Sequence, residues 1–141
     1  MSRNAFPKQF LDILGTGRTL LQSTYDRFST FCPEGNIFVV TNEAYVETVK
    51  AQLPGLDPSR ILSEPHRKNT APCIAYAAYR ISAIDPDARM VVAPSDHLIT
   101  HEEEFKRVVL QGLEFAAGKN SLITLGIKPS RPDTGYGYIQ F

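Results

Sequence analysis

Short apolar runs alternate with helical patterns along the chain, and this alternation limits the fold more than any other feature. The runs suited to buried strands lie at 37–40, 61–62, 90–93 and 121–127, and a last one opens at 134–139. Patterns typical of helices fill the intervals, at 18–31, 43–53, 71–84 and 102–117. Strands that alternate with helices form parallel sheets, because each helix carries the chain back to the start of the next strand. We therefore expect a three-layer α/β fold with a mostly parallel sheet covered on both faces.

Composition excludes several classes of protein. A chain of 141 residues forms one domain at most, and its hydrophobic fraction of 43% suits a folded core. The formal net charge of zero gives no general attraction to nucleic acid or to anionic membranes. No apolar run approaches the roughly 18 residues of a membrane span, and the N-terminus lacks the apolar core of a signal peptide. The two isolated cysteines agree with a reducing, cytoplasmic location.

The segment after the apolar run at 90–93 is the first candidate site. Pro94 ends the predicted strand because it has no N–H to donate, and Ser95, Asp96 and His97 follow. In open α/β sheets ligands bind beyond the carboxyl ends of the strands, and a carboxylate there suits Mg²⁺. The alternative is that Asp96 caps the helix that begins near Glu102. Spacing alone leaves both interpretations open.

Two further signals near the N-terminus are weak when taken alone. Gly15-Thr16-Gly17 has part of a phosphate-loop pattern, but the third glycine of the dinucleotide fingerprint is absent. Arg3 and Lys8 lie in the segment 2–10, which has no clear period and is most simply a solvated tail.

Four segments taken together, in this order, resemble mannose-1-phosphate guanylyltransferases, which belong to the sugar-nucleotide pyrophosphorylase group of nucleotidyltransferases. They are Ser-Arg and Pro-Lys-Gln-Phe within 2–10, Glu-Pro and Arg-Lys-Asn-Thr-Ala-Pro within 64–72, Ala-Pro-Ser-Asp-His at 93–97, and Leu-Gly-Ile-Lys-Pro and Thr-Gly-Tyr-Gly-Tyr-Ile within 125–139. The resemblance covers nearly the whole chain. It implies a Rossmann-like nucleotidyltransferase fold and an enzyme of GDP-mannose biosynthesis. The implied reaction converts GTP and mannose 1-phosphate into GDP-mannose and pyrophosphate, with Mg²⁺, by in-line attack on the α-phosphorus.

The resemblance also implies a role for each segment. Arg3 and Lys8 would contact the triphosphate, Asp96 would hold the metal, and Ser95 beside it would be a nucleotide-binding residue. Glu64 would read guanine, because a carboxylate can accept both N1–H and the 2-amino group. The alternative for Glu64 is a salt bridge with Arg67 or Lys68. The remaining implied contacts are to base and ribose from Asn69, Thr70 and Ala71, and to the sugar from Gly135, Tyr136 and Gly137.

The chain also departs from the family pattern. Members begin with an apolar strand and a glycine-rich loop before the Ser-Arg pair, and they continue beyond the last segment. We therefore expect residues 1–141 to be a partial catalytic domain that is inactive alone, and that closes its sheet differently or pairs with another molecule. A homo-oligomer is compatible with this expectation. Two alternatives stay open: a related enzyme that uses UTP, dTTP or CTP, and a catalytically inactive nucleotide-binding or regulatory module.

Overall fold

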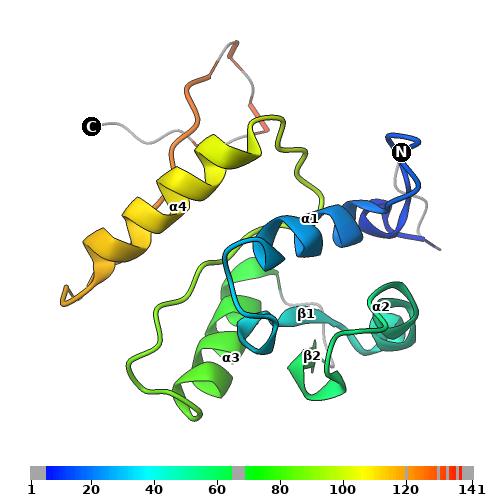
Figure 1. The fold of residues 1–141 in the computed structure, drawn as a ribbon, viewed down its shortest axis with the longest axis horizontal. Coiled ribbons are helices and arrows are strands. Elements are labelled where there is room, and N and C mark those ends of the chain that lie inside the picture. The colour runs from blue at the N-terminus through cyan, green and yellow to red at the C-terminus, as the bar shows by residue number, and fades with distance from the viewer. Residues whose placement is uncertain are drawn as a thin grey trace.

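The structure is a computed structural model that describes residues 6–64, 69–119, 121–129, 131–132, 134–135 and 137. Within these residues it contains four α-helices and two short strands (Figure 1). The helices are α1 (Leu20–Ser29), α2 (Val46–Gln52), α3 (Thr70–Ser82) and α4 (Glu102–Ala116), and the strands are β1 (Val39–Asn42) and β2 (Ile61–Glu64). Short 3-10 turns lie between them: η1 (Lys8–Phe10), η2 (Glu34–Asn36), η3 (Glu43–Tyr45) and η4 (Pro58–Arg60).

Helices lie in all four predicted ranges, although 43–45 form the 3-10 turn η3 before α2. Three of the four have a local signal that starts or ends them. Thr19 and Gln22 form a capping box at the start of α1. Pro72 lies in the first turn of α3, where its missing N–H costs nothing. After α4 the backbone turns at Gly118, whose φ of 70° suits a residue without a side chain.

The two strands form a parallel pair that anchors a small core. Val39 pairs with Ile61 and Asn42 with Glu64, so both strands end at the same edge. The buried cluster beside them draws on η1, α1, α2 and the turn after α2. Its members are Phe10, Leu21, Val49, Leu53 and Leu56. Figure 1 shows α2 and the strands on one side of the molecule, α4 on the other, and α1 between them.

The predicted strand at 90–93 is wrong. These residues have no regular secondary structure, and Val91 and Val92 are 38% and 53% exposed rather than buried. A strand needs backbone partners along its edges, whereas this segment is attached to α4 through Arg89, whose Nη1 donates to the Leu113 carbonyl at 3.1 Å. The expected large sheet is therefore reduced, in the described residues, to the β1–β2 pair.

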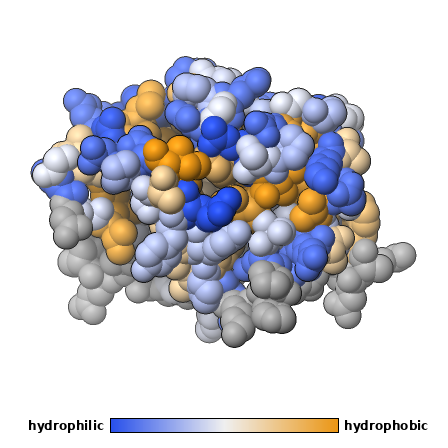
Figure 2. Space-filling view, turned by 90° about the horizontal axis from the view of Figure 1, so that it is seen from below, coloured by the Kyte–Doolittle hydropathy of each residue, from blue (hydrophilic) through white to orange (hydrophobic). Residues whose placement is uncertain are grey.

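The predicted strand at 121–127 is also wrong, since its residues are irregular and exposed. Leu122 is fully exposed, and Ile127 is 85% exposed. Half of the run at 134–139, residues 136, 138 and 139, lies outside the described residues. Apolar side chains consequently reach the surface among hydrophilic ones (Figure 2). Among the described residues, no helix has the length and apolar character needed to cross a membrane.

Candidate functional site

An ion pair joins two residues that lie far apart in the sequence. Lys8 Nζ lies 2.7 Å from Asp96 Oδ2. Lys8 opens η1, and η1 is fixed by Phe10, which is buried in the core cluster. The interpretation of Lys8 as part of a solvated tail is therefore wrong. Arg3, its predicted companion, lies outside the described residues.

The capping interpretation of Asp96 is wrong as well. The residue at the cap position of α4 is His101, whose side chain makes no capping hydrogen bond. Asp96 instead turns to Lys8, and its side chain is 28% exposed. The adjacent Ser95 carbonyl accepts a long hydrogen bond of 3.5 Å from Thr24 Oγ1, on a buried position of α1. The Ser95–Asp96 turn is thus held between η1 and α1.

A second cluster lies where the two strands end. The parallel register brings Asn42 beside Glu64. Asn42 Nδ2 donates to the Glu64 carbonyl at 3.2 Å, and Asn42 Oδ1 accepts the Ala44 N–H at 3.1 Å. One amide side chain therefore ties the two strand ends together and leaves the Glu64 carboxylate for other contacts.

The first turn of α3 faces this strand end. Burial raises the pKa of the Cys73 thiol, and the negative charge of Glu64 raises it further, so the Glu64 carboxylate lies near this turn. Thr70 and Ala71 are exposed there, where backbone N–H groups lack helical partners. The alternative salt bridges of Glu64, to Arg67 and Lys68, lie outside the described residues.

The backbone at Asn69 is strained. Its φ of 68° and ψ of −175° fall in a region that only glycine adopts readily. Such strain costs about 1–3 kcal/mol and is common where a backbone is shaped for a ligand. The predicted base and ribose contacts at 69–71 therefore include the one non-glycine residue with positive φ among those the structure describes.

The predicted sugar contacts are exposed. Gly135 lies in a turn and Gly137 in irregular backbone. A Cβ added at Gly137 would meet nothing within 4 Å, so the backbone there is open to approach. Tyr136 lies outside the described residues.

The side chains around Asp96 supply only some of the oxygen ligands that Mg²⁺ needs. The described residues contain no cluster of three or more His, Cys, Asp or Glu side chains that could hold a metal. Asp96 supplies hard carboxylate oxygens, one of which already attracts a cation at 2.7 Å. Mg²⁺ commonly takes one or two carboxylates and completes its shell with phosphate oxygens and water. The site therefore fits Mg²⁺ carried with a phosphate ligand.

The glycine turn before α1 already holds an anion from its own chain. Asp12 accepts the Thr16 N–H at 3.1 Å and the Gly17 N–H at 2.7 Å. Partial desolvation raises the pKa of Asp12, but these and neighbouring backbone hydrogen bonds outweigh it and leave the pKa lowered. The weak phosphate-loop signal at Gly15-Thr16-Gly17 thus corresponds to a turn closed by a carboxylate.

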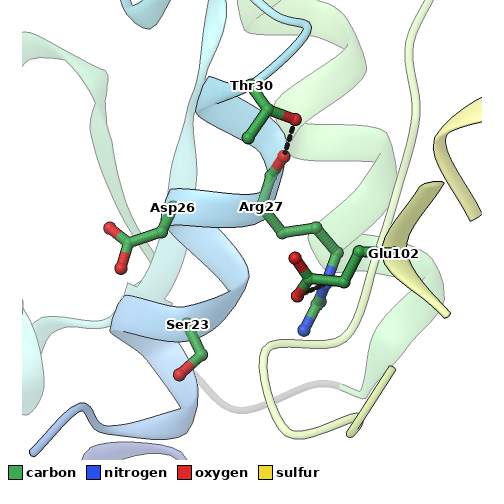
Figure 3. Close-up of a pocket in the computed structure, with 5 residues that line it drawn as sticks. All are labelled: Ser23, Asp26, Arg27, Thr30 and Glu102. Atoms are coloured by element: carbon green, nitrogen blue, oxygen red, sulfur yellow. Dashed lines mark hydrogen bonds and ion pairs between the residues drawn. The ribbon is translucent and has the colours of Figure 1, made fainter. Parts of the chain in front are cut away.

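The sequence analysis missed a buried arginine between α1 and α4. A cavity of about 280 Å³ opens there, lined by Ser23, Asp26, Arg27, Thr30 and Glu102 (Figure 3). Arg27 Nε donates to Glu102 Oε1 at 3.0 Å, whereas Asp26 points away from them and pairs with Arg18. Arginines thus pair with both carboxylates that line this cavity, those of Asp26 and Glu102. A cavity lined in this way does not suit a phosphate. The available signal was spacing, since Arg27 follows Leu20 and Thr24 on the buried side of α1.

Comparisons with known proteins agree on one family. The model of the family described as nucleotidyl transferase matches residues 1–141. The xanthan biosynthesis protein XanB of Xanthomonas campestris is 40% identical over 99% of this chain. A mannose-1-phosphate guanylyltransferase of Sinorhizobium fredii is 41% identical, and the alginate biosynthesis protein AlgA of Pseudomonas aeruginosa is 34% identical, each over 99% of this chain. The chain spans 30%, 28% and 29% of these three relatives.

Proposed function

The chain belongs to the nucleotidyl transferase family, and from this premise we propose that it is part of the catalytic domain of a mannose-1-phosphate guanylyltransferase. The resemblance predicted from four sequence segments is confirmed, because several relatives carry that name. The proposed substrates are GTP and mannose 1-phosphate, and the products are GDP-mannose and pyrophosphate.

The observation that carries the proposal is the ion pair between Lys8 and Asp96. A metal–triphosphate complex requires a cation and a carboxylate close together. The ammonium attracts the phosphate oxygens, and the carboxylate attracts the metal. The pair brings together the first and third of the four family segments.

The proposed chemistry is a single displacement. An oxygen of the sugar phosphate forms a bond to the α-phosphorus of GTP, and the bond from that phosphorus to the bridging oxygen breaks, releasing pyrophosphate. Lys8, with Arg3, would orient and neutralise the triphosphate, and Asp96 would hold Mg²⁺. The metal, when bound, supplies charge neutralisation on the phosphate oxygens.

The strand-end cluster supports the choice of base. Guanine presents two adjacent donors that a carboxylate can accept, whereas adenine presents an acceptor at the matching ring position. Glu64 lies half-buried at the end of β2, and its backbone is tied by Asn42. Asn69, Thr70 and Ala71 would then contact base and ribose, and Gly135, Tyr136 and Gly137 the mannose.

A nucleotide-binding module without turnover is the second candidate. The observation that favours it is the glycine turn at Gly15–Gly17, whose backbone donors are engaged by Asp12 rather than open to phosphate. Such a module would bind GTP and release no pyrophosphate.

The test compares GTP with ATP and UTP as ligands of the wild-type chain and of Glu64→Gln. We expect the wild-type chain to prefer GTP and the variant to lose about ten-fold or more of that preference, since hydrogen bonds to a charged group contribute about 1.5–3 kcal/mol each. Glu43→Gln is the control, because Glu43 is an exposed carboxylate just after β1. An unchanged preference in Glu64→Gln contradicts the base assignment. Pyrophosphate release from GTP and mannose 1-phosphate, measured on the chain joined to its natural flanking sequence, separates the transferase from the binding module, because residues 1–141 alone are expected to be inactive.

A further inference from the structure

We propose that Arg27 is a positioning residue: through its ion pair with Glu102 it fixes the segment that carries Asp96, and so it sets the affinity for the metal–triphosphate complex. The inference rests on the proposed function, because it assigns a new role to a residue outside the proposed contacts. Arg27 itself has no partner among the residues assigned to the substrates.

Helix α1 holds the Asp96 segment at both ends. Thr24 and Arg27 are one turn apart on α1, and both are buried. Thr24 bonds the carbonyl of Ser95, directly before Asp96, and Arg27 bonds Glu102, the first residue of α4. Thr24 and Arg27, on one face of α1, therefore fix the two ends of the seven-residue segment from Asp96 to Glu102.

The stronger of these anchors is the ion pair. The Arg27 side chain is 5% exposed, while that of Glu102 is 54% exposed. A buried guanidinium requires a charged partner, because leaving it unpaired is far more costly than the pair itself. Figure 3 shows the two side chains directed toward each other across the cavity wall. This pair holds the start of α4 against α1.

Aromatic contacts make the same junction rigid. The Arg27 guanidinium lies 5.8 Å from the centroid of the Phe105 ring, and Phe28 meets that ring edge to face, also at 5.8 Å. The first turn of α4 is therefore fixed in both position and rotation. Lys8 lies in η1, whose Phe10 shares the core cluster with Leu21 of α1, so both members of the Lys8–Asp96 pair are placed by elements that pack on α1.

Glu102, the exposed member of the Arg27–Glu102 pair, can be substituted to test the inference against a matched control. Glu102→Gln removes the charge that Arg27 requires, and Glu104→Gln removes a charge from the same first turn of α4. Glu104 pairs with Arg107 on the exposed surface of its own helix, so the two variants share the loss of a carboxylate and differ in the link to α1. The probes are Mn²⁺ alone and the Mn²⁺–GTP complex. Because GTP itself binds Mn²⁺, the fraction bound to the protein is measured directly, by equilibrium dialysis.

We expect Glu102→Gln to weaken Mn²⁺ binding in the presence of GTP by about ten-fold, at the low end of what removing a group that orients a metal ligand costs, because Glu102 acts through Arg27 and does not contact Asp96 itself. Affinity for GTP without metal should stay at the wild-type value, since Lys8 is untouched. Glu104→Gln should match the wild-type chain in both measurements. Arg27→Lys, which keeps the charge but loses the planar fork, should fall between wild type and Glu102→Gln. Urea unfolding of each variant checks that the fold is kept.

The outcomes separate this inference from the proposed function. If Asp96→Asn weakens Mn²⁺ binding while Glu102→Gln behaves like Glu104→Gln, the positioning role of Arg27 is wrong and the metal role of Asp96 stands. If Asp96→Asn has no effect, or the wild-type chain binds no Mn²⁺ with GTP, both are wrong. A loss of stability in Glu102→Gln without a loss of Mn²⁺ affinity would assign the pair a structural role only.

Discussion

At the scale of single residues, Lys8 and the proposed metal would compete for the same carboxylate, that of Asp96. In this structure the ammonium of Lys8 occupies a carboxylate oxygen that a metal would need. Both side chains are partly exposed, so the pair itself is weak, of the order of 0.2–1 kcal/mol. A metal–triphosphate complex offers each member a better partner, because it brings a divalent cation to Asp96 and phosphate oxygens to Lys8.

Lys8→Met should therefore have opposite effects with and without nucleotide. Mn²⁺ alone should bind up to about five-fold more tightly, since the energy of an exposed ion pair no longer competes. With GTP present, binding should weaken, because the triphosphate loses a cation. The measurement is Mn²⁺ affinity by titration, and Lys50→Met, which removes an exposed lysine paired with Glu47, is the control. Equal affinities for Mn²⁺ alone in Lys8→Met and wild type would contradict the competition.

At the scale of elements, the helices could be predicted from sequence and two of the strands could not. A helix satisfies its hydrogen bonds locally, so the helical spacing of apolar residues in 18–31 and the glycine at position 118 were sufficient signals. A strand needs a partner elsewhere in the chain, and the runs at 90–93 and 121–127 do not find one among the described residues. The site residues show the same contrast between signals local to the sequence and contacts between distant segments. Resemblance suggested Lys8 and Asp96, but the contact of Arg27 with α4 depends on how two helices pack.

The capping box of α1 provides an element-scale prediction. Thr19 Oγ1 accepts the Gln22 N–H at 3.3 Å and donates to Gln52 Oε1 at 2.8 Å, so it starts α1 and also ties it to α2. Thr19→Ala should lower the free energy of unfolding by about 1–2 kcal/mol, measured by urea denaturation. Thr16→Ala, which removes an exposed hydroxyl, should change it by less than about 0.5 kcal/mol. A Thr19→Ala variant as stable as Thr16→Ala would show that the cap contributes little.

At the scale of the whole molecule, a small core supports a large apolar surface. The buried cluster lies around η1, α1, α2 and the two strands, whereas α3, α4 and the irregular segments beyond them leave apolar side chains in water. The most exposed are Tyr79, Ile84, Leu122 and Ile127. Exposed apolar surface of this kind favours contact with another molecule.

We therefore expect the 141-residue chain to self-associate as its concentration rises, which multi-angle light scattering would measure. Leu122→Glu combined with Ile127→Lys should shift the distribution toward the monomer, because charges would then need to be buried in the contact. Ile13→Glu, at an exposed apolar position before α1, is the control and should leave association unchanged. A wild-type chain that stays monomeric at all accessible concentrations would contradict this prediction.

The carboxylate of Asp12 links the integrity of the N-terminal region to acidity. Because the folded-state pKa of Asp12 is lowered from 3.8, its two hydrogen bonds are fully present above that value and are lost only as the pH falls through the lowered one. Exposed glycine turns are where proteases cut most readily. At neutral pH the two hydrogen bonds keep this turn closed. In strong acid it opens, and an acid protease could then separate Lys8, together with η1, from the rest of the molecule.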